Sequence, residues 1–113
     1  MPFIDSKISL KLSEQKKETI KTRLGEAVSI LGKSETYLMV GFEDGYSLYM
    51  GGRKLENGAY VSVSLFGKPS SDACNNFTAE VCRILESELE IPGRNIYVSY
   101  WGTGEWGWNG NNF

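Results

Sequence analysis

The sequence predicts an α/β (α+β) fold in which two β-α-β units form a four-stranded mixed sheet with two helices on one face. Three observations support this prediction. Four short segments alternate apolar and polar residues, two longer segments carry apolar residues at helical spacing, and the order strand, helix, strand occurs twice in 113 residues. A helical crossover returns the chain parallel to the strand that it left, so each half should contain one parallel pair.

The first half of this structural repeat covers residues 1–57. Residues 2–9 predict a strand, and Ser13 stands where the N-cap of a helix is expected. Gly32 follows as the C-cap. Residues 37–42 alternate and predict a second strand, and residues 47–50 predict a short additional one. One stripe of the helix carries its apolar residues: Ile20, Leu24, Ala27, Val28 and Leu31.

The second half, residues 58–113, repeats the plan, and we expect residues 1–113 to form one domain. Residues 59–66 predict a strand, Ser70 or Ser71 caps a helix, and Pro92 ends it before a last strand over residues 96–100. The apolar stripe of this second helix consists of Phe77, Val81, Ile84, Leu85 and Leu89.

The sheet face away from the helices has an unusual composition. It carries aromatic and small polar residues together, and two interpretations remain open: a face in contact with solvent, or an interface or wet channel between subunits. The residues concerned are Tyr60, Ser62, Ser64, Tyr97 and Ser99.

Composition and charge exclude several classes of function. The net charge of −2 gives no basic surface for nucleic acid or an anionic membrane. No apolar run approaches the roughly 20 residues of a membrane span, and the first thirty residues do not resemble a signal peptide. The expected compartment is the cytoplasm, with non-classical secretion as an alternative.

Metal and thiol chemistry are not expected. Cys74 and Cys82 fall in one predicted helix, where eight residues separate them by about 12 Å at the helical rise, too far for a disulfide. The chain has no histidine and no C-x-x-C motif. The sequence therefore predicts no metal site and no cofactor.

The C-terminal segment is rich in aromatic residues. Trp106, Trp108 and Phe113 stand close to the chain end, and the pair Asn109-Gly110 favours a tight turn. Large aromatic side chains at a chain end need a surface to pack on. Three surfaces are open at this point: the core, a neighbouring subunit or a ligand pocket.

Five blocks along the whole chain resemble the macrophage migration inhibitory factor family of the tautomerase superfamily. The resemblance implies trimers built from pairs of β-α-β units and an N-terminal catalytic proline. The blocks are Pro2-Phe3-Ile4, Leu31-Gly32-Lys33, Leu65-Phe66-Gly67-Lys68, Asn95-Ile96-Tyr97-Val98 and Gly107-Trp108-Asn109-Gly110-Asn111-Asn112-Phe113.

The resemblance also implies roles for individual residues. Pro2 matches the catalytic proline, and Lys33 matches the lysine that binds the substrate carboxylate. The remaining matched positions line the pocket: Phe66 through its backbone, Tyr97 and Ser99 from the adjacent subunit, and Trp106, Trp108 and Phe113 as its apolar rim.

Three positions depart from the family pattern. Ser99 stands where the best-known member has asparagine, which shortens the hydrogen-bonding side chain. Trp106 replaces a small aliphatic residue, so it should narrow or reshape the pocket. The family's C-x-x-C is absent, and residues 56–59 read Glu-Asn-Gly-Ala instead. No thiol-oxidoreductase activity is therefore expected.

The implied chemistry is keto–enol tautomerisation of an aromatic 2-oxo acid of the phenylpyruvate type, with dopachrome-type substrates as a variant. Loss of Met1 leaves Pro2 with a secondary amine, and α-amino groups ordinarily have a pKa of about 7.7–8.0. Burial and the nearby ammonium of Lys33 both favour the neutral amine. A neutral amine can move a proton between carbon and oxygen.

Two other functions fit the same resemblance. One is a trimeric, cytokine-like protein that binds a receptor and keeps only a vestigial pocket. The other is a hydratase or decarboxylase that uses the same Pro2 base on a different substrate. Turnover of an aromatic enol acid that depends on Pro2 would distinguish the tautomerase from the receptor-binding protein. Assays with a panel of unsaturated and halogenated acids would distinguish the tautomerase from the hydratase or decarboxylase.

Overall fold

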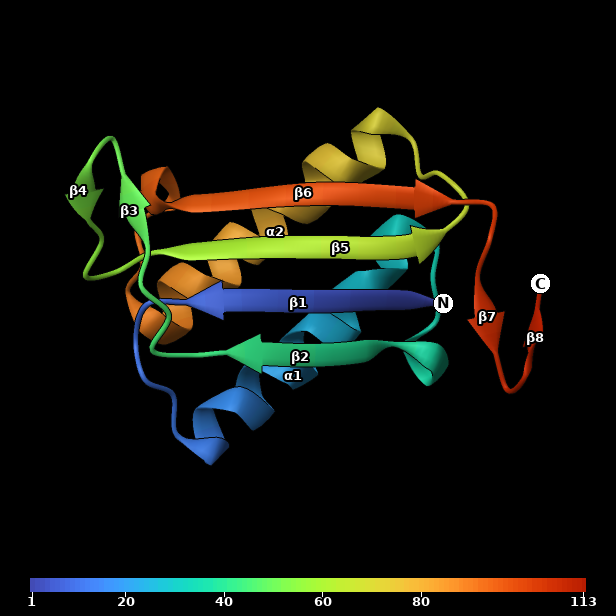
Figure 1. The fold of residues 1–113 in the computed structure, drawn as a ribbon, viewed down its shortest axis with the longest axis horizontal. Helices are drawn as coiled ribbons and strands as arrows, with labels where there is room; N and C mark the ends of the chain where they lie inside the picture. The colour runs from blue at the N-terminus through green and yellow to red at the C-terminus, as the bar shows by residue number, and fades with distance from the viewer.

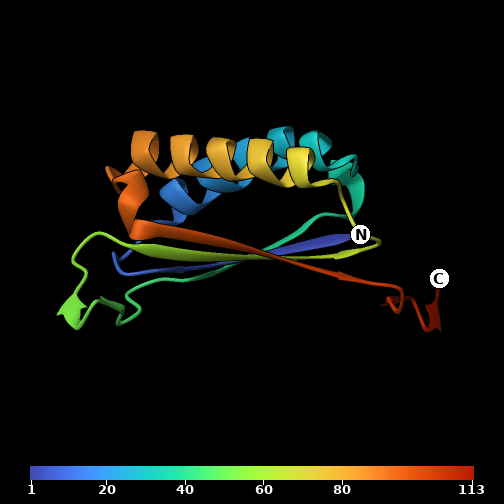
Figure 2. The same ribbon diagram turned by 90° about the horizontal axis from the view of Figure 1, so that it is seen from above.

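The computed structural model describes residues 1–113 and shows one four-stranded sheet with both long helices on one face (Figures 1 and 2). Figure 2 shows the opposite sheet face uncovered. The main elements are β1 (Pro2–Ile8), α1 (Glu14–Ala27), β2 (Met39–Glu43), β5 (Ala59–Phe66), α2 (Ser71–Leu89) and β6 (Ile96–Thr103).

Shorter elements lie at the ends of the sheet. The 3₁₀ turns are η1 (Val28–Leu31), η2 (Glu35–Tyr37) and η3 (Gly93–Asn95), and the small strands are β3 (Tyr49–Met50), β4 (Arg53–Lys54), β7 (Gly107–Trp108) and β8 (Asn111–Asn112). β3 pairs with β4 and β7 with β8 as two hairpins, which project from opposite ends of the molecule (Figure 1). No helix is long and apolar enough to span a membrane.

The strand order is β2-β1-β5-β6, with parallel outer pairs and an antiparallel central pair. This arrangement confirms the predicted mixed sheet with one parallel pair in each half. In the central pair, Pro2 lies opposite Leu65, so β1 begins where β5 ends. The two halves are thus joined in the sheet by the antiparallel pairing of β1 with β5.

The core lies between the helices and the covered sheet face. β1 and β5 alternate buried and half-buried residues along their whole length, as the sequence pattern predicts. One cluster of 17 buried residues joins both halves, so neither half has a core of its own. Its fully buried members include Ile4, Ile8, Ile20, Val63, Leu65, Phe77 and Ile91.

The predicted helix caps are present. The hydroxyls of Ser13 and Ser70 accept hydrogen bonds from the backbone N–H groups of Lys16 and Ala73, at 3.0 and 3.1 Å. Gly32 has φ +72°, the left-handed conformation of a C-cap glycine. The first helix differs from the prediction only in its last turn, because α1 ends at Ala27 and continues as η1.

The second predicted strand begins two residues later than expected, at Met39. Tyr37 lies instead in the turn η2, where the hydroxyl of Ser34 accepts a hydrogen bond from the N–H of Thr36 at 3.1 Å. A serine that bonds to the nearby backbone in this way favours a turn over a strand. The alternating pattern over residues 37–42 therefore placed the start of this strand two residues too early.

Glu88 connects the two helices on the outer surface. Its carboxylate accepts hydrogen bonds from Arg23 at 3.0 Å and from Lys16 at 3.3 Å, both on α1. Its side chain is only 18% exposed. Hydrogen bonds from Arg23 and then from Lys16 hold the pKa of Glu88 below its ordinary value.

We predict that Glu88→Gln lowers stability at pH 7 and that the difference from the wild type disappears in acid. A carboxyl whose pKa is lower in the folded state stabilises the fold above its unfolded pKa, about 4.3, and this contribution is lost as the pH falls through the folded pKa. Urea unfolding at pH 7 and pH 3 measures the effect. Glu86→Gln is the matched control, since Glu86 forms no ion pair. An equal deficit at both pH values would contradict the prediction.

Candidate active site

Four segments that are distant in sequence meet at one end of the sheet. β1 begins there at Pro2, and the antiparallel β5 ends beside it at Phe66. β6 runs parallel to β5, so the hairpin β7–β8 that follows it lies at the same end (Figure 1). The end of η1 brings Lys33 to this edge from the helix layer. Of the predicted site residues, Pro2, Trp106 and Trp108 line one hollow at this end. Lys33 and Phe113 do not line it but contact Phe66 at the end of β5.

Lys33 is fixed to the end of β5. Its ammonium Nζ donates a hydrogen bond to the backbone oxygen of Phe66 at 2.8 Å, in a half-buried setting. An ammonium carries three donors, so two remain for other acceptors. Lys33 makes no ion pair with a carboxylate of this chain, so its charge is not neutralised there.

A hollow of about 460 Å³ opens beside Pro2. This volume is in the range of small-molecule sites, and most of the lining is apolar, as such sites usually are. Pro2 itself is buried. The other lining side chains include Met1, Tyr37, Met39, Trp106 and Trp108.

The C-terminal hairpin is held to this edge by aromatic contacts. Trp108 packs edge-to-face on Tyr37, with ring centroids 5.6 Å apart, and Phe113 packs edge-to-face on Phe66 at 5.5 Å. Trp108 and Phe113 remain 52% and 54% exposed, so these two rings are not part of the core. The predicted tight turn is present: Asn109 has φ +52° and Gly110 φ +86°.

The electrostatic environment lowers the pKa of an amine at this position. In the chain that retains Met1, the pKa of the N-terminal amine lies below its ordinary value, first because of burial and second because of the charge of Lys33. Both causes disfavour the protonated form. Pro2 is buried in the same place, so its amine would experience the same two effects once Met1 has been removed.

Tyr97 and Ser99 do not join this cluster within one chain. They lie on the uncovered face of β6, and Tyr97 lines a second hollow of about 200 Å³ with Tyr49, Met50 and Tyr60. The phenol oxygen of Tyr60 is 2.7 Å from the hydroxyl oxygen of Ser99. Their expected place in the site therefore requires a second copy of the chain.

Several residues near the site were not predicted from the sequence. Tyr37 and Met39 line the hollow beside Pro2, and Trp101 contacts Ser99. The one sequence signal for Tyr37 was its position shortly after Lys33. We interpreted Tyr37 as part of a strand and did not place it in the site. Met39 is 67% exposed and Trp101 59% exposed, which marks both as surface apolar residues.

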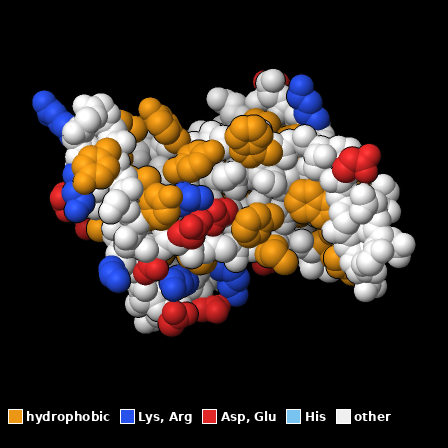
Figure 3. All heavy atoms as spheres, in the orientation of Figure 1, with side chains coloured by type: hydrophobic (Ala, Val, Ile, Leu, Met, Phe, Trp, Pro, Cys, Tyr) orange, Lys and Arg blue, Asp and Glu red, His pale blue; other side chains and the backbone are white.

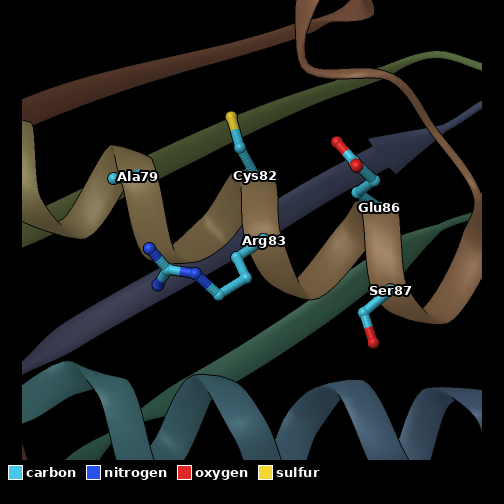
Figure 4. A pocket seen from close by; sticks show the side chains of 5 residues that line it. All are labelled: Ala79, Cys82, Arg83, Glu86 and Ser87. Carbon is cyan, nitrogen blue, oxygen red and sulfur yellow. The ribbon is translucent and has the colours of Figure 1, made fainter.

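A further hollow on α2 does not have the features of a reactive site. Figure 4 shows Cys82 and Glu86 on one side of the helix, while Arg83 and Ser87 extend toward α1. Burial, and then the charge of Glu86, raises the pKa of the Cys82 thiol. A raised pKa reduces the thiolate fraction, so this cysteine is a poor nucleophile. Cys74 and Cys82 are both free.

Comparison with known proteins identifies the family. The model of the macrophage migration inhibitory factor (MIF) family matches residues 1–113. MIF2 from Leishmania major is similar with 32% identity and a TM-score of 0.93, over 100% of this chain and 97% of that chain. A MIF homologue from Prochlorococcus marinus has 26% identity and a TM-score of 0.87, over 98% of both chains.

The fold extends beyond MIF proteins. A wild-type fused 4-OT protein, described as a symmetric trimer, has 15% identity and a TM-score of 0.85, over 97% of this chain and 94% of that chain. This likeness shows the fold alone. The comparison with curated proteins finds no match. The match over the whole chain and the shared architecture show that this protein belongs to the macrophage migration inhibitory factor family, with the fold of the tautomerase superfamily.

Proposed function

We propose that the protein is a keto–enol tautomerase of aromatic 2-oxo acids of the phenylpyruvate type, and that Pro2 is its base after removal of Met1. One observation carries this proposal: Pro2 is buried in an apolar hollow, and both burial and Lys33 lower the pKa of the N-terminal amine there. Membership of the MIF family supports it.

The proposed reaction moves one proton. The neutral amine of Pro2 takes a proton from the carbon next to the ketone, the carbon–carbon double bond of the enolate forms, and the ammonium of Pro2 returns the proton to the oxygen. The reverse order converts the enol into the ketone. No other reactant is consumed, because the two forms have the same atoms.

Lys33 is the proposed partner of the substrate carboxylate. Its Nζ is held 2.8 Å from the oxygen of Phe66, so its position is set before substrate binds. A preorganised cation stabilises the negative charge that develops on the enolate and needs no rearrangement during the reaction. The aromatic ring of the substrate would pack against Trp106, Trp108 and Tyr37. Trp106 is larger than the aliphatic residue of the family pattern and would narrow this part of the pocket.

We further propose that the working form is a homotrimer in which the adjacent copy supplies Tyr97 and Ser99. Tyr97 and Trp101 are 64% and 59% exposed on the uncovered sheet face, and Figure 3 shows hydrophobic side chains distributed over that face. Exposed aromatic groups of this size favour an interface. The related fused 4-OT protein is described as a symmetric trimer.

The first prediction for this function concerns Met1. While Met1 is attached, the nitrogen of Pro2 is part of a tertiary amide and cannot act as a base. We expect Met1-free protein to convert phenylpyruvate enol into the ketone, and protein that retains Met1 to be slower by about 100-fold or more, since general bases contribute 10²–10⁴-fold. Mass spectrometry of two preparations, one treated with methionine aminopeptidase, and an absorbance assay of the enol measure both properties.

Variants of proline provide the control. Pro2→Gly should lower turnover, whereas Pro92→Gly, at the N-cap of η3, should not. Equal activity with and without Met1 would remove Pro2 as the base. Absence of turnover in all preparations, with the trimer intact, would instead favour the receptor-binding alternative.

The second prediction concerns Lys33 and pH. The amine acts as a base only when it is neutral, so kcat/KM should rise with pH through the pKa of the amine. Burial and then the charge of Lys33 lower the pKa of the Met1 amine, and we expect both effects on the amine of Pro2. Lys33→Met removes the second effect and should therefore move the rise to higher pH. The variant should also lose about 10-fold or more in kcat/KM for the acid but little for its methyl ester, since a charge-assisted contact contributes about 1.5–3 kcal/mol.

Lys68→Met is the matched control, because Lys68 is exposed and follows the same strand β5. It should change neither the pH profile nor the preference for the acid. An unchanged pH profile in Lys33→Met, with equal losses for acid and ester, would show that Lys33 is only a surface charge.

A further inference from the structure

Met39 stands at the mouth of the hollow beside Pro2. It is the first residue of β2 and lies opposite Phe3 in the parallel pairing with β1, one residue from Pro2. β2 is an outer strand of the sheet, so one of its sides has no neighbouring strand. Met39 lines the hollow and is nevertheless 67% exposed. Its thioether is therefore open to solvent and borders the space that a ligand would fill.

Met39 is the one thioether that remains at this hollow once Met1 has been removed. The chain has three methionines, and Met1 is the only other one that lines the hollow. The third, Met50, is half-buried and lines the second hollow instead. A thioether on a flexible side chain makes favourable contacts with aromatic rings. Met39 can therefore provide apolar surface for the ring of a bound ligand.

We propose that Met39 is a modification site, and that its oxidation by a peroxide weakens the binding of aromatic carboxylates in the hollow. The sulfur attacks one oxygen of hydrogen peroxide, so an S–O bond forms and the O–O bond breaks. The sulfur is oxidised by two electrons to the sulfoxide, and the second oxygen of the peroxide is reduced and leaves as water. This inference rests on the proposed function, because it concerns the regulation of the same site.

The sulfoxide would change the wall of the hollow and leave the core intact. Oxidation turns an apolar thioether into a strongly polar group. A ligand ring seated against that group would remove water from its oxygen, and covering a polar atom without a hydrogen bond is unfavourable. Met39 does not belong to the buried core cluster, so the fold should tolerate the change. Thiol-dependent sulfoxide reductases reverse the oxidation, which makes the site a reversible switch.

The test measures the affinity for cinnamate, an aromatic carboxylate with no ketone to tautomerise, before and after oxidation. Met1-free protein is treated with hydrogen peroxide and then with dithiothreitol, which reduces disulfides and sulfenic acids of Cys74 and Cys82 but not the sulfoxide. Peptide mass spectrometry should place one added oxygen on Met39. Calorimetry should show binding that is weaker by at least about fivefold, the lower end for covering an unpaired polar group. Methionine sulfoxide reductases should restore the affinity.

Two leucine variants are compared with the wild type by the ratio of affinities before and after peroxide. Met39→Leu has no thioether at the hollow, so its ratio should be about one whatever its initial affinity. Met50→Leu is the matched control and should keep the ratio of the wild type, because Met50 lines the other hollow.

Weakening that persists in Met39→Leu would assign the effect to another residue and overturn the proposal. Three other results would overturn it: an unoxidised Met39 after peroxide, unchanged or tighter binding by the oxidised protein, and no binding of cinnamate before oxidation. Turnover of phenylpyruvate enol is measured separately. Peroxide-sensitive binding in a protein without turnover would reject the tautomerase and keep the modification site.

Discussion

The antiparallel pairing of β1 with β5 is the constraint on which the candidate site depends. It places Pro2 opposite Leu65, so the first residues of the chain lie beside the end of a central strand. Because β6 runs parallel to β5, the chain that follows β6 emerges at the same edge and returns as the aromatic hairpin. Gly102 permits this exit, since a Cβ at that position would collide with the carbonyl oxygen of Gly67. A shift of one residue in the central register would exchange the two faces of β1 and take Pro2 out of its buried position.

The electrostatics of this edge follow from the same pairing. The end of β5 presents the carbonyl oxygen of Phe66, and this oxygen holds the ammonium of Lys33. The hollow beside it contains no carboxylate that could neutralise the charge. A fixed cation in an apolar setting attracts an anionic ligand and disfavours a second positive charge. The pKa of the N-terminal amine of Met1 is lowered first by burial and second by this charge. The arrangement therefore suits a neutral amine and a carboxylate ligand at the same time.

The sequence predicted the fold well because its signals are local. Serines at both helix starts, a glycine in the left-handed conformation after η1 and strict alternation in β1 and β5 are each readable over a few residues. Tyr37 was misplaced because its alternation with its neighbours resembled a strand, while the turn depended on one hydroxyl of Ser34. The hydrogen bond between Tyr60 and Ser99 could not be predicted, since it crosses between strands two register positions apart. The roles of the predicted site residues stay predictions, although the structure brings most of those residues to one edge.

The proposed division of the site between two regions of the chain would have a consequence for assembly. Within one copy, the cationic apolar hollow lies at the edge of the sheet, whereas the hydroxyl and aromatic groups of Tyr60, Tyr97 and Ser99 lie on its uncovered face. An interface that joins an edge of one copy to a face of the next is heterologous, because the two copies contribute different surfaces. Repetition of this contact gives a closed ring if the rotation between copies closes, and an open filament if it does not. A closed ring would give every copy one complete site and leave no unpaired aromatic face. A dimer that used the same contact would complete one site and expose the other half, so catalysis and ring closure would be linked by the same residues.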